Sequence, residues 1–267
     1  MSNMTLGKYI PLDSIIHKMD PRAKIIAMLL LVTAIFFPSG WLGYGIIGCC
    51  IIFTVFLAKL NLKFVLKSMK PMITMMFFLF IINVLVIKSG DILFTIFNLS
   101  VYSDAVFQTL YIIVRLILMI MITTTLTATT KPLDLTLGIE DLLIPLKRFK
   151  VPAHEIAMLI SIALRFIPDL IDETQRIMKA QASRGVDIQE GKFKEKIMAI
   201  LSLIVPLFVS ALQRAEDLAN AMEARGFVPG AKRTRYKVLK MKYYDYILIT
   251  SSIFLVLLMW FISRFYA

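Results

Sequence analysis

Long apolar runs are the feature of this sequence that most restricts how the chain folds. Five such runs lie at residues 24–37, 44–58, 71–87, 105–127 and 246–262. Several of them approach the roughly 20 residues that an α-helix needs to cross a bilayer. Hydrophobic residues make up 58% of the 267 residues, whereas soluble domains contain about 45–50%. We therefore predict an all-α integral membrane protein with about five transmembrane helices.

Signals for the start of a helix precede the first run. Asp20 suits the N-cap position, and Pro21 suits the first helical position. A helix over residues 21–37 is about 25 Å long, so it spans the bilayer only if Arg22 and Lys24 extend toward the head groups.

Positive charge is distributed unevenly between the loops. The formal net charge is +12, which in a soluble chain would suggest nucleic acid. In a membrane protein, the excess of cationic residues in cytoplasmic loops explains it. Lysines and arginines are frequent before the first run and in residues 59–70, but nearly absent from the turns after the first and third runs. We predict a multi-pass protein with a cytoplasmic N-terminus and no nucleic-acid partner.

Residues 131–245 carry most of the charged residues and also two apolar stretches, residues 155–167 and 197–212. If only the second stretch crossed the membrane, the basic segment 232–242 would lie outside, and if both crossed, the basic region 176–196 would. The first stretch contains Arg165 and the second Pro206. We therefore predict that neither crosses. The expected organisation is a four-span membrane domain (1–130), a cytoplasmic coupling-helix region (131–245) and a fifth span (246–267).

The charged region predicts two helices with the same ending, "SRG" and "ARG". Their expected starts, proline bends and final arginines are Pro152, Pro168 and Arg184 for the first helix, and Lys194, Pro206 and Arg225 for the second. Each arginine follows an apolar stripe, seven residues after Ile177 or Leu218. One interpretation is a helix end that enters a groove and pairs its guanidinium with carboxylates or carbonyls. The other is an ordinary helix end, with a glycine C-cap and an arginine that complements the helix dipole.

These two helix ends resemble the Ala-Arg-Gly coupling helices of the transmembrane T component of energy-coupling factor (ECF) transporters. The segment "GKYIPLDSIIHKMDPRAK" is similar to the opening signature of that family. The resemblance covers the whole chain, and the first motif departs from it only in having Ser183 before Arg184. It implies a non-catalytic scaffold in the plasma membrane of a prokaryote. That scaffold would couple two ABC-type ATPases to a small substrate-binding membrane S component that takes up a vitamin or other micronutrient.

The resemblance also implies which residues meet the partners. The expected ATPase-docking residues are Ser183, Arg184, Gly185, Ala224, Arg225 and Gly226. ABC ATPases are soluble, whereas a membrane partner offers apolar surface, so we expect the apolar halves of both helices to contact the S component. The candidate contact residues are Ile160, Leu164, Leu203 and Leu207.

The sequence contains no recognisable catalytic constellation. The nearest approach to a phosphate-binding loop, "GVDIQEGKF", has its glycines one residue too far apart and places Phe193 where Ser or Thr would hold Mg²⁺. The only histidines, His17 and His154, are far apart in sequence. We therefore predict no catalytic site, no cofactor and no metal, and the carboxylate or histidine cluster of a membrane-embedded enzyme is missing.

A second hypothesis is a self-contained membrane channel or secondary transporter with a cytoplasmic regulatory insertion. Such a protein needs polar groups or broken helices at the bilayer midplane. Only Arg115 and Asn83 offer such groups. Arg115 is either a functional charge or part of a buried structural pair.

Overall fold

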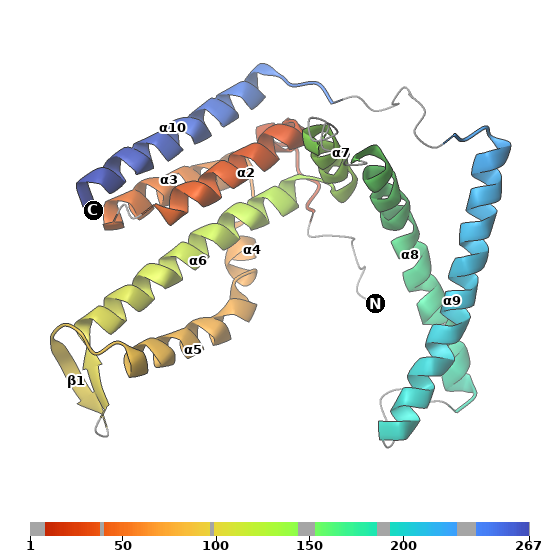
Figure 1. The fold of residues 1–267 in the computed structure, drawn as a ribbon, viewed down its shortest axis with the longest axis horizontal. Helices are drawn as coiled ribbons and strands as arrows, with labels where there is room; N and C mark the ends of the chain where they lie inside the picture. The colour runs from red at the N-terminus through yellow and green to blue at the C-terminus, as the bar shows by residue number, and fades with distance from the viewer. Residues whose placement is uncertain are drawn as a thin grey trace. The chain divides into compact units, whose positions relative to one another are not determined.

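A computed structural model describes residues 9–37, 40–96, 99–143, 153–185, 193–228 and 239–266 (Figure 1). Helices dominate these residues, and the only strands among them form one antiparallel pair, so the predicted all-α membrane fold is confirmed. The elements are α1 (Ile15–Lys18), α2 (Pro21–Phe36), α3 (Gly40–Leu57), α4 (Leu62–Lys67), α5 (Lys70–Val86), β1 (Ile92–Ile96), β2 (Leu99–Tyr102), α6 (Ser103–Thr129), α7 (Pro132–Leu143), α8 (Ala153–Ser183), α9 (Phe193–Ala224) and α10 (Tyr243–Tyr266).

The chain divides into two compact units. Residues 1–142 and 239–267 form the membrane unit, and residues 143–238 form the helix-pair unit. In the membrane unit, α2 packs along α10 and against α6, and α6 also packs against α3 and α5. Its core is aliphatic, and the largest fully buried apolar side chains are Ile35, Ile47, Ile51, Val55, Val65 and Met259.

The start of α2 agrees with the sequence prediction. Pro21 is the first helical residue, and the Asp20 carboxylate caps the helix by accepting a hydrogen bond from the Arg22 backbone N–H at 2.9 Å. The expectation that Lys24 extends toward the head groups stays a prediction, because the structure contains no membrane. The Lys24 side chain is buried within the protein, and its Nζ donates to the Thr129 carbonyl and to Thr130 Oγ1, both at 3.1 Å. Lys24 therefore binds the C-terminal end of α6, where unpaired carbonyls favour a cation.

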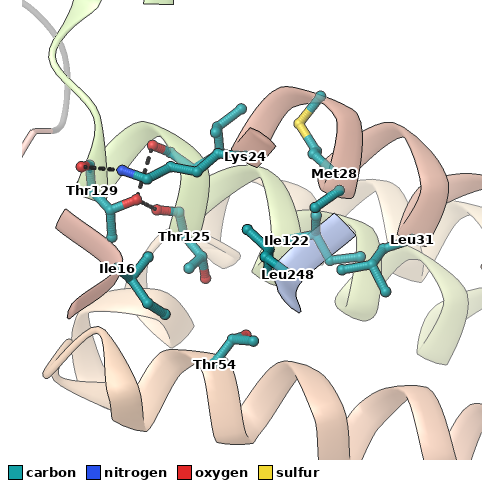
Figure 2. Close-up of a pocket in the computed structure, with 11 residues that line it drawn as sticks. Ile16, Lys24, Met28, Leu31, Thr54, Ile122, Thr125, Thr129 and Leu248 are labelled. Atoms are coloured by element: carbon teal, nitrogen blue, oxygen red, sulfur yellow. Dashed lines mark hydrogen bonds between the residues drawn. The ribbon is translucent and has the colours of Figure 1, made fainter. Parts of the chain in front are cut away.

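Lys24 also borders a small cavity in the membrane unit. The cavity has a volume of about 70 Å³ and is lined mainly by apolar side chains of α1, α2, α6 and α10, with Thr54 of α3. Figure 2 shows Lys24 reaching toward Thr129, away from the apolar side chains of Met28, Leu31 and Ile122. Its ammonium group thus keeps polar partners although the surrounding surface is apolar.

Arg115, the charge inside α6, has structural partners. Its Nε donates to the Tyr44 hydroxyl at 2.9 Å, and its guanidinium carbon lies 5.4 Å from the centre of the Phe36 ring and 5.6 Å from that of Tyr111. Cation–π contacts of this kind stabilise an arginine in an apolar setting. These contacts favour the structural interpretation of Arg115.

The structure differs from the predicted turns and loops in three places. The turn expected before residue 44 is shorter, because α3 already begins at Gly40. The lysine-rich loop contains α4, and the loop expected between the third and fourth runs contains the β1–β2 hairpin, in which Ile96 pairs with Leu99. Elements this short depend on tertiary contacts more than on a periodic sequence signal, so the sequence alone does not reveal them.

Length and composition identify four described helices that can cross a membrane: α3, α6, residues 196–224 of α9, and residues 243–265 of α10. Helix α5 is apolar but shorter, with 17 residues, and α2 has 16. The predicted topology, in which α2 and α5 span and α9 does not, depends on the distribution of charge. It stays a prediction.

Candidate functional site

The helix-pair unit consists of α8 and α9, two helices of 31 and 32 residues. At 1.5 Å per residue, each is about 45–50 Å long. The predicted starts and ends lie within about one residue of the observed ones. Both helices continue through their internal prolines, Pro168 and Pro206.

Contacts between the two helices show that they run antiparallel. Arg214 of α9 pairs with Glu173 at 3.3 Å and with Asp169 at 3.9 Å, while Gln181 Nε2 donates to the Ser202 carbonyl at 3.4 Å. A later residue of α8 thus meets an earlier residue of α9. Figure 1 shows the two helices crossing in opposite directions. Their C-terminal ends consequently lie at opposite ends of the pair.

These C-terminal ends, which we name the arginine tips, comprise residues 183–185 and 224–226. Gly185 and Gly226 have φ angles of +80° and +72°, in the left-handed region that terminates many helices. The Gly226 N–H donates to the Glu223 carbonyl at 2.8 Å and the Phe227 N–H to that of Met222 at 2.9 Å, which is the complete Schellman pattern. The glycines are therefore needed for the backbone turn, as the capping interpretation requires.

Replacing Gly226 by alanine tests this backbone role. A Cβ at this position would meet no atom within 4 Å, so the strain comes from the positive φ alone. We expect Gly226→Ala to destabilise the last turn of α9 by about 1 kcal/mol, and to speed amide exchange of Phe227 roughly fivefold. Gly226→Asn should have a smaller effect, because asparagine tolerates this conformation. Equal exchange in all three proteins would contradict the cap assignment.

The side chains of the two arginines take no part in the hydrogen bonds of these caps. Arg184 and Arg225 are exposed, and neither guanidinium forms a hydrogen bond or ion pair with any residue in the described ranges. Beside them, the Ser183 hydroxyl donates to the Lys179 carbonyl at 3.0 Å, and Ala224 is an exposed methyl group at the last helical position. Both predicted tips are therefore present as exposed cationic helix ends with small neighbours.

Part of each predicted apolar stripe packs against the rest of the helix pair. The predicted stripes comprise Leu170, Ile171, Ile177 and Met178 on α8, and Ala211, Ala215, Leu218 and Met222 on α9. Met178 and Ala215 are exposed, and the other six residues are half-buried. The stripes therefore contribute to packing in the helix pair, and the arginines extend beyond the part that is packed.

The N-terminal halves of both helices expose large apolar side chains. Of the predicted S-component contacts, Ile160 is exposed, whereas Leu164, Leu203 and Leu207 are half-buried. Other residues of the two predicted apolar halves are more exposed, and they are Leu159, Met198, Ile204, Val205, Phe208 and Leu212. Those on α9 lie mainly on the helix face opposite Leu203, Leu207 and Arg214, so the position of Arg214 could have identified this face.

The exposed apolar surface of α8 and α9 is suited to contact with a partner or a membrane. Phe208 is 62% exposed and Leu159 is 63% exposed, and contiguous apolar patches of this kind mark protein or membrane contacts. No group of three or more potential metal-binding side chains occurs among the described residues. The geometry therefore defines a helical membrane protein with paired amphipathic helices, an arrangement suited to binding partners.

Comparison with known proteins identifies the family. The profile of the CbiQ family, described as cobalt transport protein, matches residues 13–236. The energy-coupling factor transporter transmembrane protein EcfT of Bacillus subtilis is 44% identical over 262 residues, covering 98% of this chain and 99% of the relative. Its counterparts from Lactococcus lactis and Ruminiclostridium cellulolyticum are each 42% identical, covering 97% and 99% of this chain and 97% and 98% of their own lengths. The chain belongs to the EcfT family of transporter transmembrane proteins.

Proposed function

We propose that this protein is the scaffold of an ECF-type importer. It couples ATP hydrolysis by two ABC ATPases to movement of a substrate-binding S component, which takes up a vitamin or other micronutrient. The single observation that carries this proposal is the pair of glycine-capped arginine tips at opposite ends of α8 and α9. Each tip docks on one ATPase, so the protein itself needs no catalytic residue.

The chemistry of the tips supports docking. A guanidinium presents a planar fork of donors that suits carboxylates or backbone carbonyls in a groove. Ser183 and Ala224 are small, so the helix end can approach a partner's surface closely. Because the helices are antiparallel, two tips on helices about 45–50 Å long are well separated and fit two separate sockets.

The apolar halves of α8 and α9 hold the S component in this proposal. Their exposed Leu159, Ile160 and Phe208 offer a surface that a soluble ATPase would not cover but a membrane partner would. When the ATPases close around ATP, the sockets move and the crossing of α8 and α9 changes. The apolar surface moves with it and reorients the S component in the membrane.

Purification of the intact complex tests this function. We expect the affinity-tagged chain, extracted from its native membrane, to bring down two ATPases and a small membrane protein, and the assembled complex to take up substrate with ATP. If the chain alone, reconstituted in liposomes, transports a solute, the protein is instead a self-contained transporter. The structure gives that alternative little support, because Asn83 donates to Thr109 Oγ1 at 3.0 Å and Arg115 to Tyr44, so both candidate midplane groups have partners.

The proposed topology has its own test. Single cysteines placed at Lys67 and Lys237, the latter outside the described residues, should be protected from an impermeant thiol reagent in intact cells. Cysteines within residues 38–42 or 91–104 should react, because these segments belong to the turns that are poor in positive charge. Of these positions, 38, 39, 97 and 98 lie outside the described residues. The matched control is labelling after permeabilisation, when all positions should react. Labelling of position 237 in intact cells would overturn the claim that neither α8 nor α9 crosses.

A further inference from the structure

The first turn of α2 connects three other elements through alternate residues. Lys24 binds the end of α6, as described above, while Asp20 and Arg22 reach the two helices at which the chain leaves and re-enters the membrane unit. Helix α7 precedes the connection to the helix-pair unit, and α10 follows the connection back from it. Both covalent connections therefore start beside the same helical turn.

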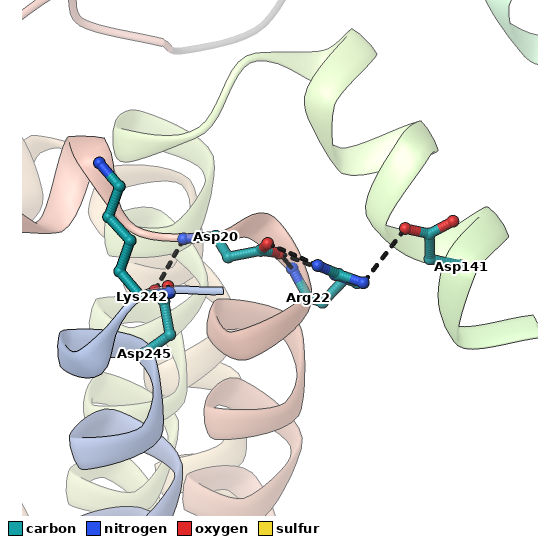
Figure 3. A network of polar contacts seen from close by, with 5 residues as sticks. All are labelled: Asp20, Arg22, Asp141, Lys242 and Asp245. Atoms are coloured by element: carbon teal, nitrogen blue, oxygen red, sulfur yellow. Dashed lines mark hydrogen bonds and ion pairs between the residues drawn. The ribbon is translucent and has the colours of Figure 1, made fainter. Parts of the chain in front are cut away.

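The connection into α10 is fixed by one buried carboxylate. Asp245 is 1% exposed, and one of its oxygens accepts from the Asp20 backbone N–H at 2.8 Å. The other accepts from the Lys242 N–H at 2.6 Å, and the Asp245 N–H donates to the Lys242 carbonyl at 3.0 Å. Figure 3 shows this carboxylate between the first residue before α10 and the residue that caps α2. Asp245 thus joins the N-termini of two helices.

The end of α7 is held through the side chain of Asp20, whereas the start of α10 is held through the Asp20 backbone N–H. Arg22 forms a bidentate pair with the Asp20 carboxylate, at 3.0 Å from Nε and 2.8 Å from Nη2, and its Nη1 lies 3.4 Å from Asp141 near the end of α7 (Figure 3). Burial raises the pKa of Asp20, but the hydrogen bonds and charge of Arg22 outweigh burial and lower that pKa overall. Asp20 is therefore ionised at neutral pH and can hold Arg22.

A glycine brings α7 close enough for this pairing. A Cβ on Gly138 would lie 3.1 Å from the Pro21 Cβ, 3.2 Å from the Ile25 Cδ1 and 3.4 Å from the Arg22 backbone nitrogen. The first two separations are tighter than normal van der Waals contact, and the proline ring cannot turn away. The close approach of α7 to the first turn of α2 thus depends on the absence of a side chain at Gly138, independently of the ion pair.

We propose that Asp20, Arg22, Gly138, Asp141 and Asp245, together named the α2 anchor, are positioning residues for both connections to the helix-pair unit. The anchor fixes the end of α7 and the start of α10 on one rigid turn, so that force from the helix pair is delivered to the membrane unit at a single place. The coupling role rests on the function proposed above, whereas the positioning role does not. Loss of one link leaves the remaining helices packed but frees one connection.

Distances between spin labels test the positioning role in the purified full chain. With the two native cysteines replaced by serine, labels at Ile139 and Phe261 report on α7, labels at Lys240 and Phe261 report on the start of α10, and labels at Phe53 and Phe261 report on the core. All four positions are exposed. We expect Asp245→Asn to broaden the 240–261 distance distribution, and Gly138→Ala to broaden or shift the 139–261 distribution, by about twofold in width. The 53–261 distribution should not change.

Uptake and ATP hydrolysis then test the coupling role. We expect both variants to keep their ATPases but to lose roughly tenfold in uptake per ATP hydrolysed, a typical effect of mutations along a coupling network. The matched control is Asp13→Asn, which removes a carboxylate from the exposed Asp13–Lys18 pair nearby and should change neither readout. Unchanged distance distributions in both variants would overturn the anchor. Broadened distributions with unchanged uptake per ATP would overturn its coupling role, and absence of ATPases from the unmodified complex would contradict the proposed function instead.

Discussion

Arg184→Ala and Arg225→Ala combined should abolish stable binding of the ATPases and ATP-driven uptake, while the membrane unit stays folded. Both side chains are exposed and without a partner among the described residues, so their removal costs the isolated chain little. In the complex, each guanidinium becomes a partly buried contact, and truncation of such a charged partner typically costs about 2–5 kcal/mol. Each single variant should weaken uptake and keep one socket occupied. Co-purified ATPase and substrate uptake measure both effects.

Lysine at either position separates docking from capping. A lysine retains the positive charge at the helix end but lacks the bidentate fork, so it should restore ATPase binding only partly. If the arginines served only the helix dipole, lysine would restore it fully, and each alanine would cost about 1 kcal/mol or less. Lys179→Ala, one turn before the first tip, is a matched control that removes an exposed cation from the same helix. Normal assembly and uptake in the double alanine variant would refute docking.

A charge on the apolar half of α9 should release the S component and leave the ATPases bound. Phe208 is the most suitable position, because it is well exposed, whereas Leu203 and Leu207 also pack within the chain. Phe208→Asp places a carboxylate in an apolar interface, where an unpaired charge is strongly disfavoured. We expect S-component association to fall by at least about 100-fold, equivalent to roughly 2.7 kcal/mol. The S component and ATPase retained on the tagged chain measure the two effects separately.

The controls for this variant come from the same helix. Gln213→Asp introduces the same charge at an exposed polar position near the end of the apolar half and should leave both partners bound. Leu203→Asp should release the S component too, but with some loss of helix-pair stability. Loss of both partners from Phe208→Asp would show that α9 has unfolded, and retention of the S component would show that it binds elsewhere.

Local signals explain what the sequence could predict. The ends of α8 and α9 were predictable because Gly185 and Gly226 end each helix by a backbone conformation that other residues rarely adopt. The start of α2 was predictable for a similar reason, since Asp20 and Pro21 act on the first turn itself. These features depend on a few neighbouring residues, so they survive without knowledge of the fold.

Long-range contacts explain what the sequence could not predict. Asp20 and Asp245 are separated by 225 positions, and no local pattern indicates that one carboxylate caps the helix beside the other. The burial of Lys24 likewise depends on the end of α6, which lies 105 residues away. On α9, the sequence pattern identifies Leu203, Leu207 and Phe208 as apolar. Only the packing of α9 against α8 shows that Leu203 and Leu207 are half-buried and that Phe208 is exposed.

Photo-crosslinking from the arginine tips tests the central claim most directly. A photoreactive residue at Ser183 or Ala224 lies beside an unchanged arginine on an exposed helix end. In native membranes, each position should crosslink to an ATPase subunit, and a protein with both substitutions should capture two ATPases per chain. The same residue at Phe208 should crosslink to a small membrane protein instead. Crosslinks from positions 183 and 224 to lipid or to the S component, with none to an ATPase, would contradict the account.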